Sequence, residues 1–223
     1  MKILIGVSLS KKNLKFLDKF LESLSLMKIP SNYSLKYIFI LEKKNFYFSD
    51  KIKKKLINRK YDLIFVKKNG IPNSRNEFLK YLRKNNSMYC GFLDDDCIVH
   101  KEWLINMVKF IKKNKCDIVG GPQFHKVKKI FYKNLFNIIE PNRKHNQKID
   151  WIATNNAFLK SQIINKTKIS FDPKFKNIGG SDQLFFKRLI TINDYNCRWN
   201  INSYVIENIQ KERENFTWFI KRN

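Results

Sequence analysis

Hydrophobic residues along the first half of the chain alternate between two spacings. Four short apolar runs predict buried strands, at residues 3–8, 37–41, 63–66 and 88–93. Around these runs, apolar residues at helical spacing predict amphipathic helices near residues 14–24, 51–58, 72–84 and 103–111. Strands that alternate with helices favour parallel pairing, so the sequence predicts an α/β fold, with a mostly parallel, Rossmann-like sheet flanked by helices.

The second half is less regular and predicts a smaller, mixed portion of the same domain. We expect a strand and turn at residues 117–122, an apolar segment at 151–159 and a helix over 179–189. Residues 125–148 are basic and poorly periodic, which predicts a mobile connection, and the aromatic and basic residues 211–223 form a candidate amphipathic packing helix. The chain has 223 residues, 43% of them hydrophobic, and we expect one domain over 1–223.

Basic residues outnumber acidic ones by 45 to 19, giving a formal net charge of +26. Such a charge favours anionic partners, including nucleic acid and membrane surfaces. The basic residues are nevertheless scattered among Asn, Ile and Phe along the whole length, and a dedicated nucleic-acid arm would form a block. Specific nucleic-acid binding is therefore not expected, whereas contact with an anionic membrane or a polyanionic substrate stays open.

Cysteine usage and hydropathy bear on where the protein works. The four cysteines have neither C-x-x-C spacing nor paired histidines, so neither a zinc site nor a disulfide framework is indicated. No run approaches the roughly 20 apolar residues of a membrane span. We expect a cytoplasmic protein, with a peripheral position at the inner face of the cell membrane left open.

Three consecutive carboxylates, Asp94, Asp95 and Asp96, follow the fourth apolar run in this acid-poor chain. Ligands of open parallel sheets bind at the carboxyl ends of strands, which is the position that the triplet occupies. Repulsion between adjacent carboxylates calls for a cation, and Mg²⁺ or Mn²⁺ takes carboxylate oxygens together with substrate phosphates. The alternative is a solvated turn that caps the following helix.

Three further polar positions could carry chemistry. Asp182 follows two glycines at the start of a predicted helix, where a carboxylate could serve as a base or simply cap the helix. Asn155–Asn156 lies in an apolar stretch and suits either a sugar pocket or a turn. Arg75–Asn76 could meet a phosphate at a helix start or be solvated.

Taken in order, these segments resemble the family 2 glycosyltransferases of GT-A fold, which are inverting nucleotide-sugar transferases. The resemblance covers nearly the whole chain. It rests on the first strand at 3–8, the Asn-Gly-Ile-Pro-Asn-Ser-Arg-Asn segment at 69–76, the Phe-Leu-Asp-Asp-Asp strand end at 92–96, the small strand at 154–159 and the Gly-Gly-Ser-Asp segment at 179–182. It implies a nucleotide-sugar-binding half over 1–122 and an acceptor-side half over 123–223. The tail resembles the region where family members contact the membrane or the acceptor.

The resemblance also implies residue roles. Asp94 would approach the nucleotide ribose and phosphate, Asp96 would bind a divalent metal (Mn²⁺ or Mg²⁺) that bridges the diphosphate, and Asp182 would be the catalytic general base. Glu42 could contact the base and Arg75 would lie near the diphosphate. The other expected nucleotide-sugar-binding residues are Ser8, Asn76, Asp95, Asn156 and Gly180.

Two departures from the family pattern stand out. Ser181 replaces the usual Glu before the base, and no histidine after Glu207 suits a third metal contact. The chemistry still asks for two acidic centres, because a metal stabilises the leaving diphosphate and a separate carboxylate activates the acceptor hydroxyl.

The sequence therefore predicts a metal-dependent inverting glycosyltransferase that moves a sugar from a nucleotide-diphosphate donor to a glycan or lipid-linked acceptor. The family and the charge suggest a role in surface polysaccharide or lipopolysaccharide synthesis. One alternative is a nucleotidyltransferase or another metal-dependent phosphoryl-transfer enzyme that uses the same acidic triplet. A second is a non-catalytic basic binding module.

Overall fold

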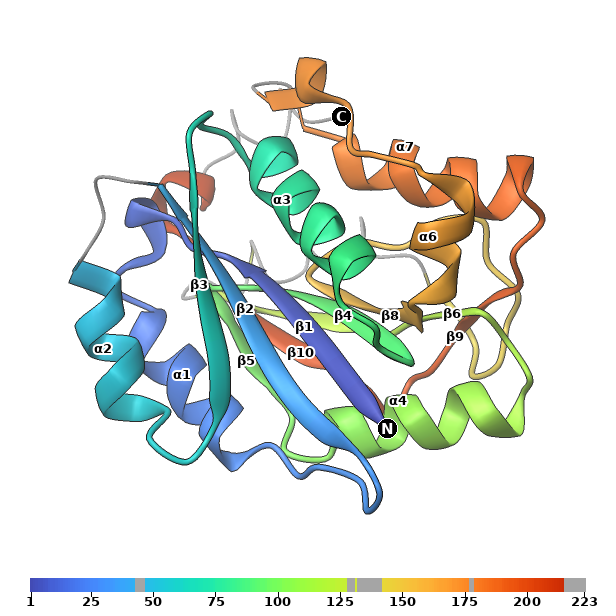
Figure 1. Cartoon of the computed structure of the whole chain (residues 1–223), viewed down its shortest axis with the longest axis horizontal. Coiled ribbons are helices and arrows are strands. Elements are labelled where there is room, and N and C mark those ends of the chain that lie inside the picture. Colours follow the sequence, from blue (N-terminus) through green and yellow to red (C-terminus); the bar gives the residue numbers. More distant parts are fainter. Residues whose placement is uncertain (43–46, 128–130, 132–141, 177–178, 215–223) are drawn as a thin grey trace.

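The computed structural model describes residues 1–42, 47–127, 131, 142–176 and 179–214. Its core is a seven-stranded sheet (Figure 1). The strands in spatial order are β3 (Lys60–Val66), β2 (Ser34–Glu42), β1 (Lys2–Ser8), β4 (Tyr89–Asp94), β8 (Asn156–Lys160), β6 (Ile118–Gly120) and β9 (Cys197–Trp199). Among these described strands only β8 runs antiparallel to its neighbours, so the predicted mostly parallel α/β sheet is confirmed.

Helices cover both faces of this sheet (Figure 1). One face packs against α1 (Leu17–Leu26), α2 (Tyr47–Lys55) and α4 (Trp103–Lys113), and the other against α3 (Ile71–Lys84), α6 (Gln162–Thr167) and α7 (Ser181–Lys187). Alternation along β1 explains the two layers, because Ile3 and Ile5 join the first core cluster and Leu4 joins the second. The strand is buried on both faces, as its continuous apolar run predicts.

A second, three-stranded sheet follows the acidic triplet and was not predicted. It consists of β5 (Cys97–Val99), β10 (Val205–Asn208) and β7 (Gln123–Lys126), with β10 in the middle. These strands are three or four residues long, too short to show a periodic pattern. Their pairing brings the chain near residue 207 beside the triplet.

Several predicted boundaries shift in the structure. The first helix begins at Leu17, because residues Lys11–Asn13 form a 3-10 turn, and α7 continues as a π-helix over Arg188–Ile192. The segment expected to be a connection at 125–148 contributes its first two residues to β7, while 128–130 and 132–141 lie outside the described residues. In the candidate tail helix, Lys211–Arg213 form a 3-10 turn and 215–223 lie outside the described residues.

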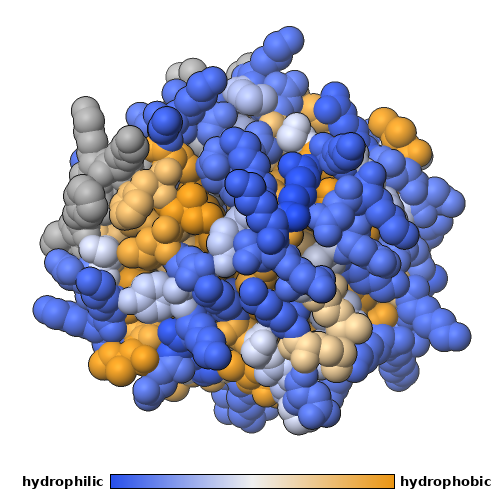
Figure 2. Space-filling model, viewed as in Figure 1, coloured by the Kyte–Doolittle hydropathy of each residue, from blue (hydrophilic) through white to orange (hydrophobic). Residues whose placement is uncertain are grey.

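Hydrophilic side chains cover most of the face seen in Figure 2, with apolar ones in smaller separate patches. Within the described part of the chain, no helix has the length and apolar character needed to cross a membrane. The four cysteines are free and buried.

Candidate active site

The carboxyl ends of β1 and β4 lie side by side and form the floor of the candidate site. Ser8, the last residue of β1, is in register with Asp94, the last residue of β4, and with Ile40 of β2. Both polar residues line a crevice together with Arg75 from α3. The strand order thus gathers residues that are far apart in the sequence at one edge of the sheet.

Arg75 connects this edge to the start of α7. Its side chain is only 9% exposed, and its Nη2 lies 3.4 Å from Oδ1 of Asp94. Its Nη1 donates to Oγ of buried Ser181 at 3.5 Å, and the guanidinium lies over the Phe171 ring at 5.6 Å from the centroid. The contacts with Asp94 and Ser181 and the stacking on Phe171 hold the planar guanidinium of Arg75 in one orientation.

Asp95 is directed into the protein. Its carboxylate accepts hydrogen bonds of 2.6 Å from the backbone N–H of Ser10 and from Nδ2 of Asn13, and the residue is 2% exposed. These contacts fix the loop that follows β1. Burial raises the pKa of Asp95 to about 7, although the hydrogen bonds from Asn13 and Ser10 oppose that rise.

Asp96 lies beside an acidic residue that the sequence analysis did not assign to the site. Its carboxylate is buried and accepts a 3.3 Å hydrogen bond from Asn13. Antiparallel pairing of β5 with β10 puts Glu207 in register with Cys97, the residue after Asp96. The backbone N–H and side-chain amide of Asn208 both donate to the Asp96 carbonyl, at 2.9 and 2.8 Å.

Glu207 is itself part of a charged network. Its Oε1 accepts from Nη1 of Arg213 at 3.0 Å, and its Oε2 lies 3.5 Å from Nε2 of His125. The only signal in the sequence was a single acid within the run Val205–Asn208, in a chain with few acids. Its position became visible only through the pairing of β10 with β5 and β7.

Burial and mutual repulsion dominate the electrostatics of this cluster. Burial, followed by the charges of Glu207 and Asp94, raises the pKa of Asp96 to about 9. The pKa of Asp94 is also raised, first by burial and then by Glu207 and Asp182, although Arg75 opposes the rise. Carboxylates that resist ionisation in each other's presence would be stabilised as anions by a cation.

The start of α7 presents Asp182 toward the same region. Gly179 and Gly180 have φ angles of 85° and 81°, a left-handed conformation that glycine adopts at little cost. Gly180 is the N-cap residue, and Asp182 lies in the first turn, where its Oδ1 accepts from the backbone N–H of Gln183 at 3.1 Å. The charge of Asp182 contributes to the raised pKa of Asp94, so the two carboxylates lie close enough to interact.

Two of the predicted donor-binding amides are engaged within the protein. Asn76 donates to the carbonyl and accepts from the N–H of Phe171, each at 2.8 Å. Asn156 accepts from Nε1 of Trp103 at 2.7 Å and donates to the carbonyls of Pro122 and Ser203 at 2.9 and 2.8 Å. Their contacts are those of residues that fix loops around the site, and nucleotide-sugar binding by either residue stays a prediction.

Glu42 ends β2, at the same edge of the sheet as Ser8 and Asp94, but its side chain lies outside the described residues. Its expected contact with the base stays a prediction.

The acidic cluster suits a hard cation only with help from a ligand. Within the described ranges, no three His, Cys, Asp or Glu side chains converge to hold a metal ion by themselves. Mg²⁺ and similar ions usually take one or two carboxylates and complete their coordination with water and substrate phosphates. Buried Asp96 and half-buried Asp94, whose charge raises the pKa of Asp96, would provide such a pair.

Comparisons with known proteins identify the fold class and the family of this chain. Solved structures of GT-A glycosyltransferases share this fold, a mostly parallel sheet flanked by helices. Residues 15–167, more than half of the chain, match Glycosyl transferase family 2, so the chain belongs to this family. The resemblance inferred from the sequence motifs is confirmed. Among the curated proteins, none matches this sequence.

Three similar structures illustrate the shared fold. Residues 1–349 of S. aureus TarS in complex with UDP superpose with a TM-score of 0.69 at 16% identity, covering 95% of this chain and 62% of that one. The mannosyltransferase PcManGT from Pyrobaculum calidifontis, in complex with GDP-Man and Mn²⁺, gives 0.71 at 14% identity, covering 99% and 60%. GalNAc-T7 with UDP, GalNAc and Mn²⁺ gives 0.70 at 11% identity, covering 94% and 44%. This chain thus spans about three fifths of the length of the first two.

Proposed function

We propose that this chain is a metal-dependent, inverting glycosyltransferase that moves a sugar from a nucleotide-diphosphate donor to a hydroxyl of a glycan or lipid-linked acceptor. The main support is the shared edge of the sheet: Arg75 contacts both Asp94 at the end of β4 and Ser181, the residue before Asp182. These contacts support the proposal that the donor-side carboxylates and the candidate base belong to one connected site.

The comparisons support a nucleotide-sugar donor. Similar structures are described with UDP, UDP-GlcNAc and GDP-Man, all nucleoside diphosphates or their sugars, and two are described with Mn²⁺. In this chain Asp94 would contact the nucleotide ribose and phosphate, Arg75 the diphosphate, and Asp96 would hold the divalent ion. A bound metal would act as a Lewis acid on the leaving diphosphate.

Asp182 is the proposed general base. The acceptor oxygen forms a bond to the anomeric carbon as its proton passes to the Asp182 carboxylate. The bond between the anomeric carbon and the phosphate oxygen breaks, and the nucleoside diphosphate leaves with the electron pair. Attack from the face opposite the leaving group inverts the anomeric carbon.

The remaining assignments stay proposals of narrower scope. Ser8, Glu42, Asn76, Asp95, Asn156 and Gly180 would line or shape the nucleotide-sugar site. Synthesis of a surface polysaccharide or lipopolysaccharide is the context that the family and the net charge of +26 suggest. An acceptor on an anionic membrane would suit that charge.

A donor screen tests the proposal. Thermal unfolding of the full chain is followed with UDP-, GDP- and other nucleotide sugars, with and without Mn²⁺, because a ligand at 100 times its Kd stabilises by ~2.7 kcal/mol. We expect one nucleotide-sugar class to stabilise the protein only with metal, and to be turned over to a nucleoside diphosphate. Release of pyrophosphate from a nucleoside triphosphate, with no nucleotide-sugar turnover, would instead establish the nucleotidyltransferase alternative.

A further inference from the structure

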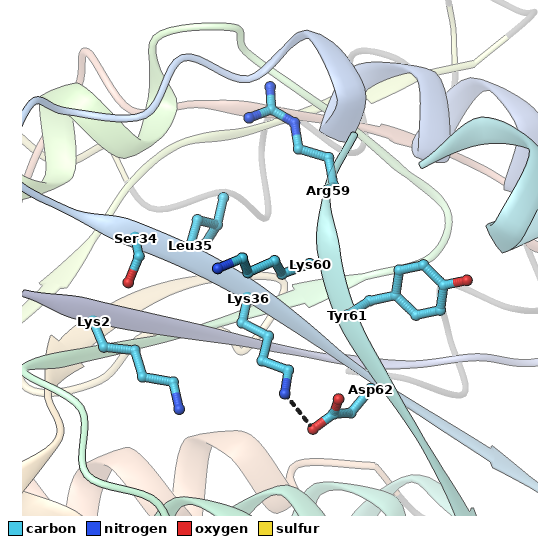
Figure 3. A pocket seen from close by; sticks show the side chains of 8 residues that line it. All are labelled: Lys2, Ser34, Leu35, Lys36, Arg59, Lys60, Tyr61 and Asp62. Atoms are coloured by element: carbon cyan, nitrogen blue, oxygen red, sulfur yellow. Dashed lines mark ion pairs between the residues drawn. The ribbon is translucent and has the colours of Figure 1, made fainter. Parts of the chain in front are cut away.

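A second candidate site lies at the opposite end of the central sheet. A cavity of about 510 Å³ is lined by residues at the starts of β1, β2 and β3 and by the residue before β3. The lining residues are Lys2, Ser34, Leu35, Lys36, Arg59, Lys60, Tyr61 and Asp62 (Figure 3). Lys2 and Ser8 are at opposite ends of β1, and at ~3.3 Å per residue this places the cavity about 20 Å from the candidate active site.

The lining is strongly cationic even for this chain. Four of its eight side chains are basic and one is acidic, which leaves a formal excess of three positive charges. The volume lies within the range of ~300–1,000 Å³ that small-molecule sites occupy. Such a cavity disfavours a cationic ligand and suits a compact anion with more than one charge.

Two of the four cations are committed to the protein. Arg59 donates from Nη2 to the carbonyls of Ser25 and Met27, at 2.6 and 2.7 Å. Lys36 forms an ion pair of 2.7 Å with Asp62, drawn as a dashed line in Figure 3. These contacts anchor the cavity wall.

The other two cations, Lys2 and Lys60, are available to a ligand. In the part of the chain that the structure describes, neither side chain takes part in a hydrogen bond or an ion pair, although the Lys2 charge acts on Asp62 at longer range. Figure 3 shows the Lys2 side chain extending from β1 and the Lys60 side chain extending from β3 over β2. Both side chains line the same cavity, and ammonium groups bind phosphate as point charges.

We propose that this cavity is a second anion site, which binds a phosphate-bearing group through Lys2 and Lys60. The group could come from a soluble phosphate compound or from a phospholipid headgroup, which share the same recognition chemistry. The site is separate from the proposed donor site and does not depend on metal.

Binding of inorganic pyrophosphate to the full chain tests this proposal, by titration calorimetry at low salt with chelator present. We expect binding that weakens with added salt. The Lys2→Gln/Lys60→Gln variant should bind about tenfold more weakly or worse, since it loses two charge-assisted contacts. The matched control, Lys53→Gln/Lys54→Gln, removes the same charge from the exposed surface of α2 and should change binding less than about twofold.

A third variant tests the sign of the effect. Asp62→Asn removes the only carboxylate of the lining and frees Lys36, so pyrophosphate should bind more tightly. Melting curves of all variants verify that they are folded, and the single variants Lys2→Gln and Lys60→Gln replace the double variant if it is not. Equal weakening by the cavity and control pairs, weaker binding by Asp62→Asn, or no binding by the wild type would each overturn the proposal.

Vesicle co-sedimentation distinguishes the two sources of phosphate. If the ligand is a lipid headgroup, the wild type sediments with phosphatidylglycerol vesicles but not with phosphatidylcholine vesicles. The Lys2→Gln/Lys60→Gln variant then sediments with neither kind of vesicle. If it is a soluble phosphate compound, pyrophosphate binding shows the variant pattern above while neither vesicle carries the protein down. Phosphatidylglycerol binding that the cavity variant leaves unchanged would contradict a lipid role for this site.

Discussion

The guanidinium of Arg75 lies 3.4 Å from the carboxylate of Asp94, and its other terminal nitrogen reaches Ser181. The two partners are on different elements, the end of β4 and the start of α7. One side chain therefore couples the proposed donor-binding edge to the helix that carries the proposed base.

Replacing Arg75 by lysine should remove the link between the end of β4 and the start of α7. An ammonium group keeps the charge but cannot span both partners, so we expect transfer to fall about tenfold or more and the free energy of unfolding to fall by ~1–3 kcal/mol. Activity and urea unfolding measure the two effects. Arg83→Lys is the control, because Arg83 is on the same helix and donates to Ile169 away from the site. Equal losses of activity in both variants would contradict the coupling role.

Asp96→Asn should abolish metal-dependent donor binding. The asparagine amide cannot become the anionic oxygen ligand that a divalent ion favours. The stabilisation of ~2.7 kcal/mol expected from Mn²⁺ and donor at 100 times Kd should therefore vanish. Thermal shift with and without Mn²⁺ measures this. The exposed pair of Glu77 with Lys80 offers the control Glu77→Gln, which should keep the full shift. An unchanged shift in Asp96→Asn would show that the metal binds elsewhere.

Asp182→Asn should separate binding from chemistry. The asparagine amide cannot take up the proton of the acceptor hydroxyl, so we expect the rate of sugar transfer to fall ~10²–10⁴-fold. The thermal shift induced by the donor should persist. Asp194→Asn is the control, since Asp194 is exposed and has a φ of 52°, which asparagine tolerates. Loss of donor binding in a folded Asp182→Asn protein would refute the role of base.

Asn156→Ala should act mainly on stability. The change leaves the Trp103 indole N–H and two carbonyls without their partner, and we expect a loss of ~2–4 kcal/mol in the free energy of unfolding. Chemical denaturation measures it. Asn114→Ala, which removes one hydrogen bond at the end of α4, should cost less than about 1.5 kcal/mol. A loss of donor binding without loss of stability would instead support the predicted sugar contact.

Asp62 should make the free energy of unfolding depend on pH. Burial raises its pKa, but hydrogen bonds from Lys36 and Tyr81 together outweigh this, so the folded pKa is below the usual 3.8. The unfolded state then binds the proton more readily, and the contribution of Asp62 is present above pH 3.8 and is lost as pH falls through the folded pKa. Wild type should exceed Asp62→Asn by up to about 1 kcal/mol at pH 6, as expected for a partly exposed pair. Melting curves should show this difference shrinking at pH 3, and a constant difference would contradict the linkage.

The sequence by itself determined the layered architecture and the edge of the sheet at which the candidate site residues lie. Apolar periodicity is local: the run at Ile3–Ser8 and the helical spacing near Leu17–Leu24 need no distant partner to be recognised. The alternating order of elements favoured parallel strands, which put the carboxyl ends of the strands with Ser8 and Asp94 at one edge of the sheet. That these two residues are direct neighbours came from the strand order in the structure. The acidic triplet stood out because the chain has few acids.

Only the tertiary structure decided what each side chain does. Asp95 binds Ser10 and Asn13, more than 80 residues away, and Asp96 meets the β10 strand, whose Asn208 is 112 residues away. Glu207 lies beside the acidic triplet because the short strands β5 and β10 pair. The Asn156 side chain forms hydrogen bonds to three distant segments. Hydrogen-bond partners at such separations leave no local pattern, since they depend on which segments the core brings together.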